Sequence, residues 1–203
     1  MADTLIPVVA SYTSTTPTGL RELTSAERVP GDYLGGGRQT LWIPAGAMTP
    51  STTNGAVMGT LEQSTNRNML KYLGFDTATQ QFAQFDVVLP KQWNRGTVTF
   101  QPYWTAASGS GTAIYQLEGV ATSDGDTMDV AFGTAVSSTD TFQSANLCHV
   151  APESAAVTIA GTPAIADRVN FRVKRDVATD TLGVDARLLG IALFVTTTAS
   201  TDV

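Results

Sequence analysis

Three aspartates in the stretch SDGDTMD, residues 123–129, are the first side chains that could do chemistry. Asp124, Asp126 and Asp129 surround a glycine, and a hard cation such as Ca²⁺ is held by several oxygen ligands at close range. The spacing differs from that of an EF-hand loop, which ends in a bidentate glutamate. A Ser-Asp-Gly-Asp run is also a favourable turn. We therefore expect a turn without a metal, with calcium as the alternative.

The single cysteine and the single histidine of the chain are neighbours, Cys148 and His149. A nucleophilic Cys–His pair needs its two side chains in hydrogen-bond contact, whereas adjacent residues of a strand point to opposite faces. One cysteine and one histidine also leave zinc without its usual ligands and exclude an internal disulfide. We expect Cys148 to be a small core residue rather than a nucleophile.

Common enzyme signatures are absent from the sequence. The stretch GDYLGGG (residues 31–37) lacks the Lys-Ser/Thr that completes a phosphate-binding loop. The stretch SGSGT (residues 108–112) lacks the pattern around a hydrolase serine. We predict that the protein is not an enzyme and has no catalytic residue, metal or cofactor. Paired carboxylates stay open, because a sequence does not show which acids meet in space; the candidates are Asp86, Glu118, Asp176, Asp180 and Asp185.

Aromatic residues gather in the stretch LPKQWNRGTVTFQPYWTAA, residues 89–107. Side chains alternate along a strand, so Val98, Phe100, Pro102 and Trp104 share one face, opposite a face of Thr, Gln and Tyr residues. This pattern predicts a half-buried strand with Trp104 in the core. Trp93 precedes the strand and either caps the end of a sandwich, which we favour, or stacks on a sugar. Under the sugar-binding alternative, the ligand-facing aromatics are Trp93, Tyr103, Trp104 and Tyr115.

The stretch RVNFRVKRD, residues 168–176, alternates in the same way. Val169, Phe171 and Val173 fall on one face, and three cations with one amide fall on the other. We favour a solvated face, or a subunit contact paired with acidic residues, over an anion site. The polar-face residues are Arg168, Asn170, Arg172 and Lys174.

The net charge and the low content of charged residues limit the kinds of partner that the protein can bind. The 203 residues contain 12 Lys and Arg against 18 Asp and Glu, so the net charge is −6, and only 15% of residues are charged. We therefore expect no nucleic-acid partner, since such binding depends on clustered cations. The longest apolar run, near residues 186–195, is shorter than the roughly 20 residues that span a bilayer. The N-terminus has no basic stretch or long apolar run, so we expect neither a signal peptide nor a membrane partner.

Short strands between turn clusters follow one another from residue 41 onward. This pattern predicts an all-β fold, a sandwich or barrel of antiparallel strands, over residues 41–203. Residues 126–147 are ambiguous between a helical turn and an inserted loop. The expected strands are residues 56–62, 69–75, 81–89, 96–104, 113–122, 155–161, 168–176 and 183–197.

Residues 1–40 differ from the rest, and we predict an extended attachment arm with Gly35–Gly37 as its hinge. Within it, residues 20–28 (LRELTSAER) carry charges suited to a short helix. The alternative is that residues 5–10 (LIPVVA) form the first strand of the sandwich. The apolar arm residues that we expect to contact a partner are Leu5, Ile6, Val8, Val9, Leu20 and Tyr33.

Three longer stretches resemble the virion structural proteins of tailed bacteriophages, of the capsid decoration (cement) or short head-fibre type. They are LWIPAGAMTPSTTNGA (41–56), FDVVLPKQWNRGTVTFQPYW (85–104) and AGTPAIADRVNFRVKRDVATDTLGVDARLLGIALFVTT (160–197). The resemblance implies a jelly-roll-like sandwich, and it does not separate head from tail or reach the arm.

Two functions follow from the resemblance as expectations. The first is a cement protein that binds the major capsid protein as a homotrimer and stabilises the outer surface of the head, in a virion assembled in the host cytoplasm. The alternative is a tail-fibre or receptor-binding module that recognises a host surface glycan.

Overall fold

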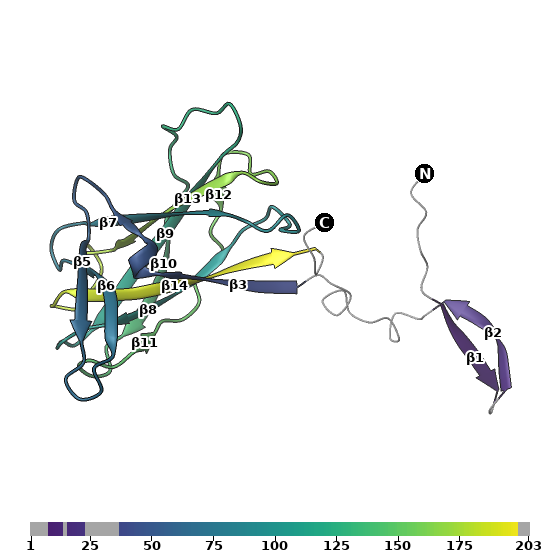
Figure 1. The fold of residues 1–203 in the computed structure, drawn as a ribbon, viewed down its shortest axis with the longest axis horizontal. Helices are drawn as coiled ribbons and strands as arrows, with labels where there is room; N and C mark the ends of the chain where they lie inside the picture. Colours follow the sequence, from purple (N-terminus) through teal and green to yellow (C-terminus); the bar gives the residue numbers. More distant parts are fainter. Residues whose placement is uncertain (1–7, 14–15, 23–36, 199–203) are drawn as a thin grey trace.

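Two six-stranded β-sheets face each other in the computed structural model, which describes residues 8–13, 16–22 and 37–198 (Figure 1). Sheet I has the order β10 (Val136–Thr141), β9 (Thr112–Thr122), β13 (Arg168–Arg175), β7 (Phe82–Val88) and β4 (Thr49–Pro50), with β12 (Ile159–Ala160) also paired to β9. Sheet II has the order β11 (His149–Val150), β8 (Thr99–Thr105), β14 (Ala186–Thr197), β6 (Met69–Phe75) and β5 (Val57–Glu62), with β3 (Gly37–Pro44) also paired to β14. The pairs are antiparallel except β12 with β9.

The prediction of an all-β, antiparallel, jelly-roll-like sandwich is therefore confirmed. The only helical element in the described part of the chain is a short 3₁₀ turn, η2 (Ala45–Ala47). None of the described residues form a helix that is long and apolar enough to cross a bilayer.

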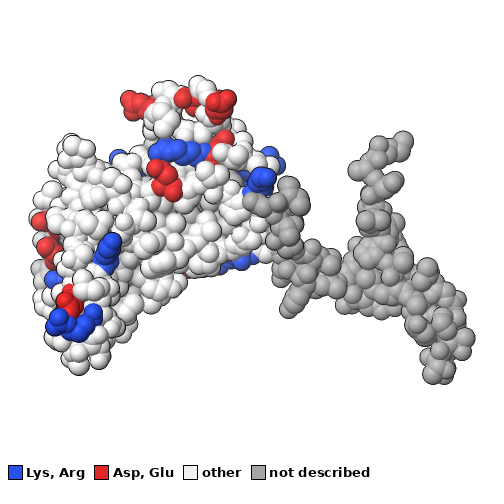
Figure 2. Space-filling view, viewed as in Figure 1, with Lys and Arg blue, Asp and Glu red and all other residues white. Residues whose placement is uncertain are grey.

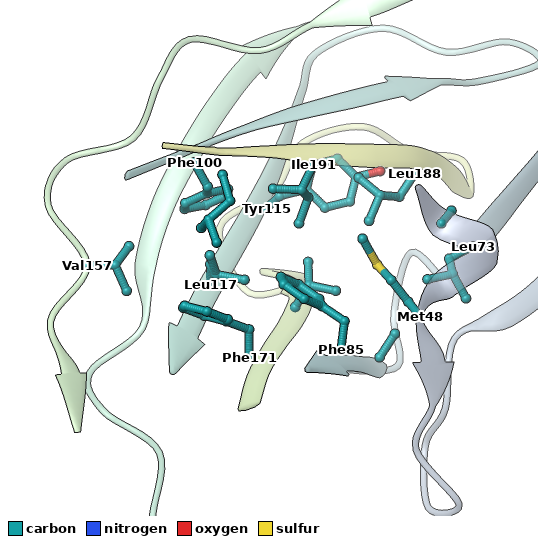
Figure 3. Packing of buried hydrophobic residues seen from close by; sticks show 14 of the residues in the cluster. Met48, Leu73, Phe85, Phe100, Tyr115, Leu117, Val157, Phe171, Leu188 and Ile191 are labelled. Atoms are coloured by element: carbon teal, nitrogen blue, oxygen red, sulfur yellow. The ribbon is translucent and has the colours of Figure 1, made fainter. Parts of the chain in front are cut away.

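Alternation of side chains builds the core between the sheets. Strand β13 buries every second residue, and strand β8 buries Phe100, Pro102 and Trp104 as predicted. Figure 3 shows Phe85 and Phe171 of sheet I lying opposite Phe100 and Ile191 of sheet II. The rings of Phe85 and Phe171 are stacked with centroids 5.3 Å apart. Large side chains from both sheets thus fill one continuous apolar layer.

A buried ion pair at the end of β13 joins the two sheets. Arg175 and Asp180 are 1% and 2% exposed, and Arg175 Nη2 lies 2.6 Å from Asp180 Oδ1. The guanidinium also donates to the carbonyl oxygen of Phe75 on β6 of sheet II (3.3 Å) and to that of Val184 (2.8 Å). The Asp180 carboxylate accepts the backbone N–H of Ile114 at 2.9 Å. Both charges are therefore surrounded by hydrogen-bonding partners, as buried ions must be.

The N-terminal hairpin is a separate sheet of two strands, β1 (Val8–Thr13) and β2 (Thr16–Glu22). Residues 8–10 pair with β2 rather than with a sandwich strand, so they are not the first strand of the sandwich. The short helix expected over residues 20–28 is wrong at its start, because Leu20–Glu22 pair with β1. The rest of that segment lies outside the described residues.

Strand β3 begins at Gly37, so residues 37–40 belong to the sandwich and not to the arm. Gly37 pairs with Thr197 at the far end of β14, and the Thr197 hydroxyl donates to the Gly37 carbonyl oxygen at 3.1 Å. The first and last paired residues of the sandwich are thus neighbours (Figure 1). Gly35 and Gly36, expected to form a hinge with Gly37, lie outside the described residues.

The ambiguous stretch after β9 is a loop, residues 123–135, followed by strand β10. Gly133 N–H donates to the Gly119 carbonyl oxygen at 3.1 Å, and the Phe132 ring lies 4.5 Å from the Arg172 guanidinium carbon. These contacts hold one end of the loop on β9 and β13. Acidic side chains gather at the tip of the loop in Figure 2, on a face that is otherwise largely uncharged.

Candidate functional site

An exposed tryptophan marks the outer face of sheet II. Of the three tryptophans in the chain, Trp42 is 49% exposed, whereas Trp93 and Trp104 are 4% and 0% exposed. Trp42 lies on β3, where exposed and half-buried residues alternate from Gly37 to Pro44. The outward residues Arg38, Thr40 and Trp42 therefore share one face.

Neighbouring strands place further side chains beside Trp42. In the register of β3, β14 and β8, Ala192 lies between Trp42 and Gln101, and Gly190 lies between Pro44 and Tyr103. The Trp42 and Tyr103 rings meet edge to face, with centroids 5.0 Å apart and an interplanar angle of 86°. Tyr103 therefore supports the indole from one side, in a geometry that aromatic pairs favour.

Gly190 makes room for the indole. A Cβ atom on Gly190 would lie 2.5 Å from two carbons of the six-membered ring of Trp42. The register of β14 against β8 also shifts between Leu188 and Gly190, opposite Tyr103. Such irregularities re-aim side chains on a sheet surface. The small residue and the register shift together let Trp42 lie over β14. We call Trp42, Tyr103 and Gly190, with Gln101 and Thr40 beside them, the aromatic platform.

A polar rim extends the platform along β14. The Arg38 guanidinium carbon lies 4.4 Å above the Phe194 ring and Arg38 forms an ion pair with Glu153. The Thr99 hydroxyl donates to the same carboxylate at 2.5 Å. The hydrogen bond from Arg38 holds the pKa of Glu153 below its usual value. Since the folded-state pKa is lowered, the ion pair persists in mild acid and is lost only as the pH falls through that lowered value.

Three of the four aromatics predicted to face a ligand are buried instead. Trp93, Trp104 and Tyr115 have exposed fractions of 4%, 0% and 0%. The Trp104 indole donates to Asp140 Oδ2 at 2.9 Å and therefore faces the interior of the sandwich. Burial also raises the pKa of Tyr115. All three belong to the core, as we favoured for Trp104, and Trp93, for which we favoured a capping position over sugar stacking, is buried in the same cluster. Of these four aromatics, only Tyr103, half-buried in the platform, has an accessible ring.

Cys148 and His149 point to opposite faces, as predicted, but the core assignment of Cys148 is wrong. Cys148 is exposed, and His149 is fully buried. The imidazole stacks on Trp104 with ring centroids 4.2 Å apart, and its Nε2 accepts the Gln143 N–H at 3.0 Å. Its second nitrogen lies 3.2 Å from the Leu147 carbonyl oxygen. Both ring nitrogens are thus engaged in structural contacts.

The carboxylates that the sequence left open take up separate structural positions. Asp86 pairs with Arg168 at 2.7 Å, and Glu118 pairs with Arg172 at 2.5 Å. Cations on the polar face of β13 therefore form ion pairs with carboxylates of the same chain. Asp176 accepts the Thr179 hydroxyl at 2.7 Å, Asp180 forms the buried pair with Arg175, and Asp185 lines a surface pocket.

The acidic loop is built as a turn. Asp126 accepts the Ser123 N–H at 2.9 Å. Throughout residues 8–13, 16–22 and 37–198, no three His, Cys, Asp or Glu side chains gather in a way that could hold a metal ion.

The predicted arm residues fall in two groups. Leu5, Ile6 and Tyr33 lie outside the described residues. Val8, Val9 and Leu20 lie in the β1–β2 hairpin, where they pair with Glu22, Arg21 and Ala10.

Comparisons with known proteins give similarity at the level of fold. No family model and no curated protein matches the chain. A crystal structure of the CBM22-1 and GH10 modules of a Clostridium thermocellum xylanase, complexed with xylohexaose, is similar with a TM-score of 0.45 and 12% identity, over 81% of this chain and 28% of that one. A CBM22 xylan-binding domain from Paenibacillus barcinonensis has a TM-score of 0.45 and 13% identity, over 76% and 98%. At these identities, the similarity concerns the sandwich fold alone.

Proposed function

We propose that this protein is a non-catalytic binding module that recognises a glycan by stacking a sugar ring on Trp42. The observation that carries this proposal is the 49% exposed indole, which lies over Gly190 and is supported edge-on by Tyr103. A sugar ring has an apolar C–H face and a polar edge. The electron-rich face of an indole attracts such C–H groups, and covering it removes apolar surface from water.

Polar groups beside the indole complement the hydroxyl edge of a sugar. Gln101 donates its amide N–H to the Ala151 carbonyl oxygen at 2.8 Å, which fixes the orientation of the side chain. Its amide oxygen receives no hydrogen bond from the described residues, so this oxygen is available to accept one from a sugar hydroxyl. The hydroxyls of Tyr103 and Thr40 act as both donors and acceptors. A ligand site usually consists of an apolar surface with a small number of polar groups around it.

Binding without catalysis fits the chemistry of the rim. Hydrolysis of a glycosidic bond usually requires two carboxyl groups that flank the bond. The carboxylate at this rim, Glu153, is already engaged by Arg38 and Thr99.

Trp42→Ala tests the proposal. We expect the variant to bind at least tenfold more weakly than the wild type, about 1.4 kcal/mol of binding free energy, because the stacking surface is removed. Affinity gel electrophoresis and calorimetry with soluble xylan, mixed-linkage β-glucan and galactomannan measure the difference. Gly190→Ala is expected to act in the same direction, since its Cβ displaces the indole.

The matched control is Tyr72→Ala. Tyr72 is another half-buried ring of sheet II, with Arg187 5.2 Å from its centroid, and it lies outside the platform. It should leave binding unchanged. Equal binding by Trp42→Ala and wild type, or no binding of any polysaccharide by the wild type, would contradict the proposed function.

We further propose that the N-terminal segment attaches this module to a larger assembly, with a phage head or fibre as the setting that the resemblance implies. The supporting observation is that β1 and β2 form their own sheet and pair with neither sheet of the sandwich. Under this proposal the protein acts as a homotrimer, either as a cement protein on the major capsid protein or as a fibre that presents its glycan site to a host.

Deletion of residues 1–35 separates attachment from folding. We expect the shortened chain to keep the unfolding transition of the sandwich, because β3 begins only at Gly37, and to lose incorporation into virions. Quantitative mass spectrometry of purified particles measures the copy number. A number comparable to that of the capsid protein supports the cement role, and a few copies support a fibre. Absence of the full-length chain from particles would overturn the attachment proposal.

A further inference from the structure

A polar groove of about 400 Å³ lies on sheet I, on the other side of the sandwich from the aromatic platform. Gln84 and Asp86 of β7 and Arg168 and Asn170 of β13 project into it. They alternate with the buried residues of the same strands, so they lie on the outer face of the sheet. The segment around β4 forms the remaining wall with Thr49 and Ser51.

The side chains of the groove hold one another in place. One oxygen of Asp86, Oδ1, accepts the amide N–H of Asn170 at 2.7 Å and lies 2.7 Å from Arg168 Nη2. Gln84 donates its amide N–H to the Ser51 hydroxyl at 3.4 Å. A network of this kind reduces the rotamer freedom that a ligand would otherwise have to freeze.

Donors and acceptors remain available in the groove. Among the described residues, no further hydrogen bond reaches the second oxygen of Asp86 or the amide oxygens of Gln84 and Asn170. The Arg168 guanidinium carries five N–H donors and forms an ion pair with Asp86 through Nη2. Hydrogen-bond acceptors and donors therefore lie together in this surface groove, where solvent or a ligand can form the remaining hydrogen bonds.

Charge balance indicates the kind of ligand. The Asp86 carboxylate and the Arg168 guanidinium offset one another, so neither an anion nor a cation gains much from this site. A hydroxyl group both donates and accepts one hydrogen bond or more. Several hydroxyls on adjacent carbons match an alternation of fixed donors and acceptors better than a singly charged group does.

We propose that the groove formed by Gln84, Asp86, Arg168 and Asn170 is a second ligand site, which takes a neutral polyhydroxylated ligand such as a sugar ring. It differs from the aromatic platform in chemistry, because it recognises hydroxyls by hydrogen bonds and offers no stacking ring. The two sites lie on opposite faces of the sandwich, so a single copy engages two ligand molecules or two chains at once. The choice of sugars as probes rests on the proposed function; the groove itself does not.

Side-chain NMR of the full-length protein tests the groove and the platform separately. The ¹⁵N-labelled protein is titrated with β-1,4-linked hexasaccharides of xylose, glucose and mannose. The amide NH₂ signals of Gln84 and Asn170, assigned with Gln84→Glu and Asn170→Asp, report on the groove. The indole N–H of Trp42, assigned with Trp42→Phe, reports on the platform. We expect saturable shifts of both sets, with separate dissociation constants.

The variant Asn170→Ala should weaken binding in the groove at least tenfold, read from the Gln84 signal, and leave the Trp42 titration unchanged. Asn66→Ala, in the turn between β5 and β6, is the matched control and should change neither. Shifts at Trp42 alone would overturn the second site and leave the proposed function standing. Shifts at the groove alone would support the second site and contradict the platform. No shift at either place overturns both.

Discussion

Asp180→Ala is expected to lower the free energy of unfolding by about 3–5 kcal/mol, one of the two largest losses that we predict for a single substitution in this chain. The substitution leaves the guanidinium of Arg175 charged and 1% exposed, without its counter-ion. It also removes the acceptor of the Ile114 and Leu182 N–H groups, which donate at 2.9 and 2.7 Å. An unpaired buried charge and two unsatisfied donors act in the same direction.

Denaturant unfolding followed by circular dichroism measures this effect. Glu62→Ala is the control, because the Arg67–Glu62 pair has side chains that are 75% and 41% exposed. We expect it to change stability by less than about 1 kcal/mol. Similar small losses for both variants would mean that water reaches Arg175, and the ion pair would then not be the link between the two sheets.

Trp104→Ala is expected to cost about 3–5 kcal/mol of stability by opening a cavity in the core. The Trp104 side chain is fully buried, stacks on His149 and donates to Asp140 at 2.9 Å. Trp104→Phe retains most of the apolar contact and loses the hydrogen bond, so we expect a smaller loss.

Trp42→Ala is the comparison that makes the Trp104 result informative. An exposed ring contributes little to folding, so this change should alter stability by no more than about 0.5 kcal/mol. Circular dichroism in denaturant suits both variants, since it does not depend on the tryptophan that was removed. A large loss for Trp42→Ala would show that the ring is part of the fold, and the platform would lose its claim to be a ligand site.

Strand periodicity explains why much of the sandwich could be predicted from the sequence. Strands β8 and β13 lie where the alternation of side chains predicted them, and their apolar faces form the core. Alternation is a local property, so one strand suffices to show it. The pairing of β3 with β14 joins residues about 150 positions apart and has no such local signal.

Two important residues were missed for different reasons. Trp42 lies in GRQTLWIP, where the other outward positions are Arg38, Thr40 and Pro44, so the alternation there could have marked it as exposed. Its support by Gly190 and Tyr103 depends on three strands and is not visible in one. Arg175 continues the buried face of β13. A buried arginine can be predicted only when its counter-ion is known, because an unpaired charge in the core is strongly unfavourable. That partner, Asp180, is fixed by the turn after the strand.

The meeting of Gly37 with Thr197 has a mechanical consequence. A force that pulled these two residues apart would open the β3–β14 pair like a zipper, loading its hydrogen bonds one after another, since antiparallel bonds run across the strands. A load carried from the N-terminal side to a ligand on Trp42 follows a different path. It enters at Gly37 and leaves through β3 itself, five residues along the same strand. The β3–β14 pair then lies beside the line of tension rather than across it, so a captured chain could be held without peeling the sandwich open.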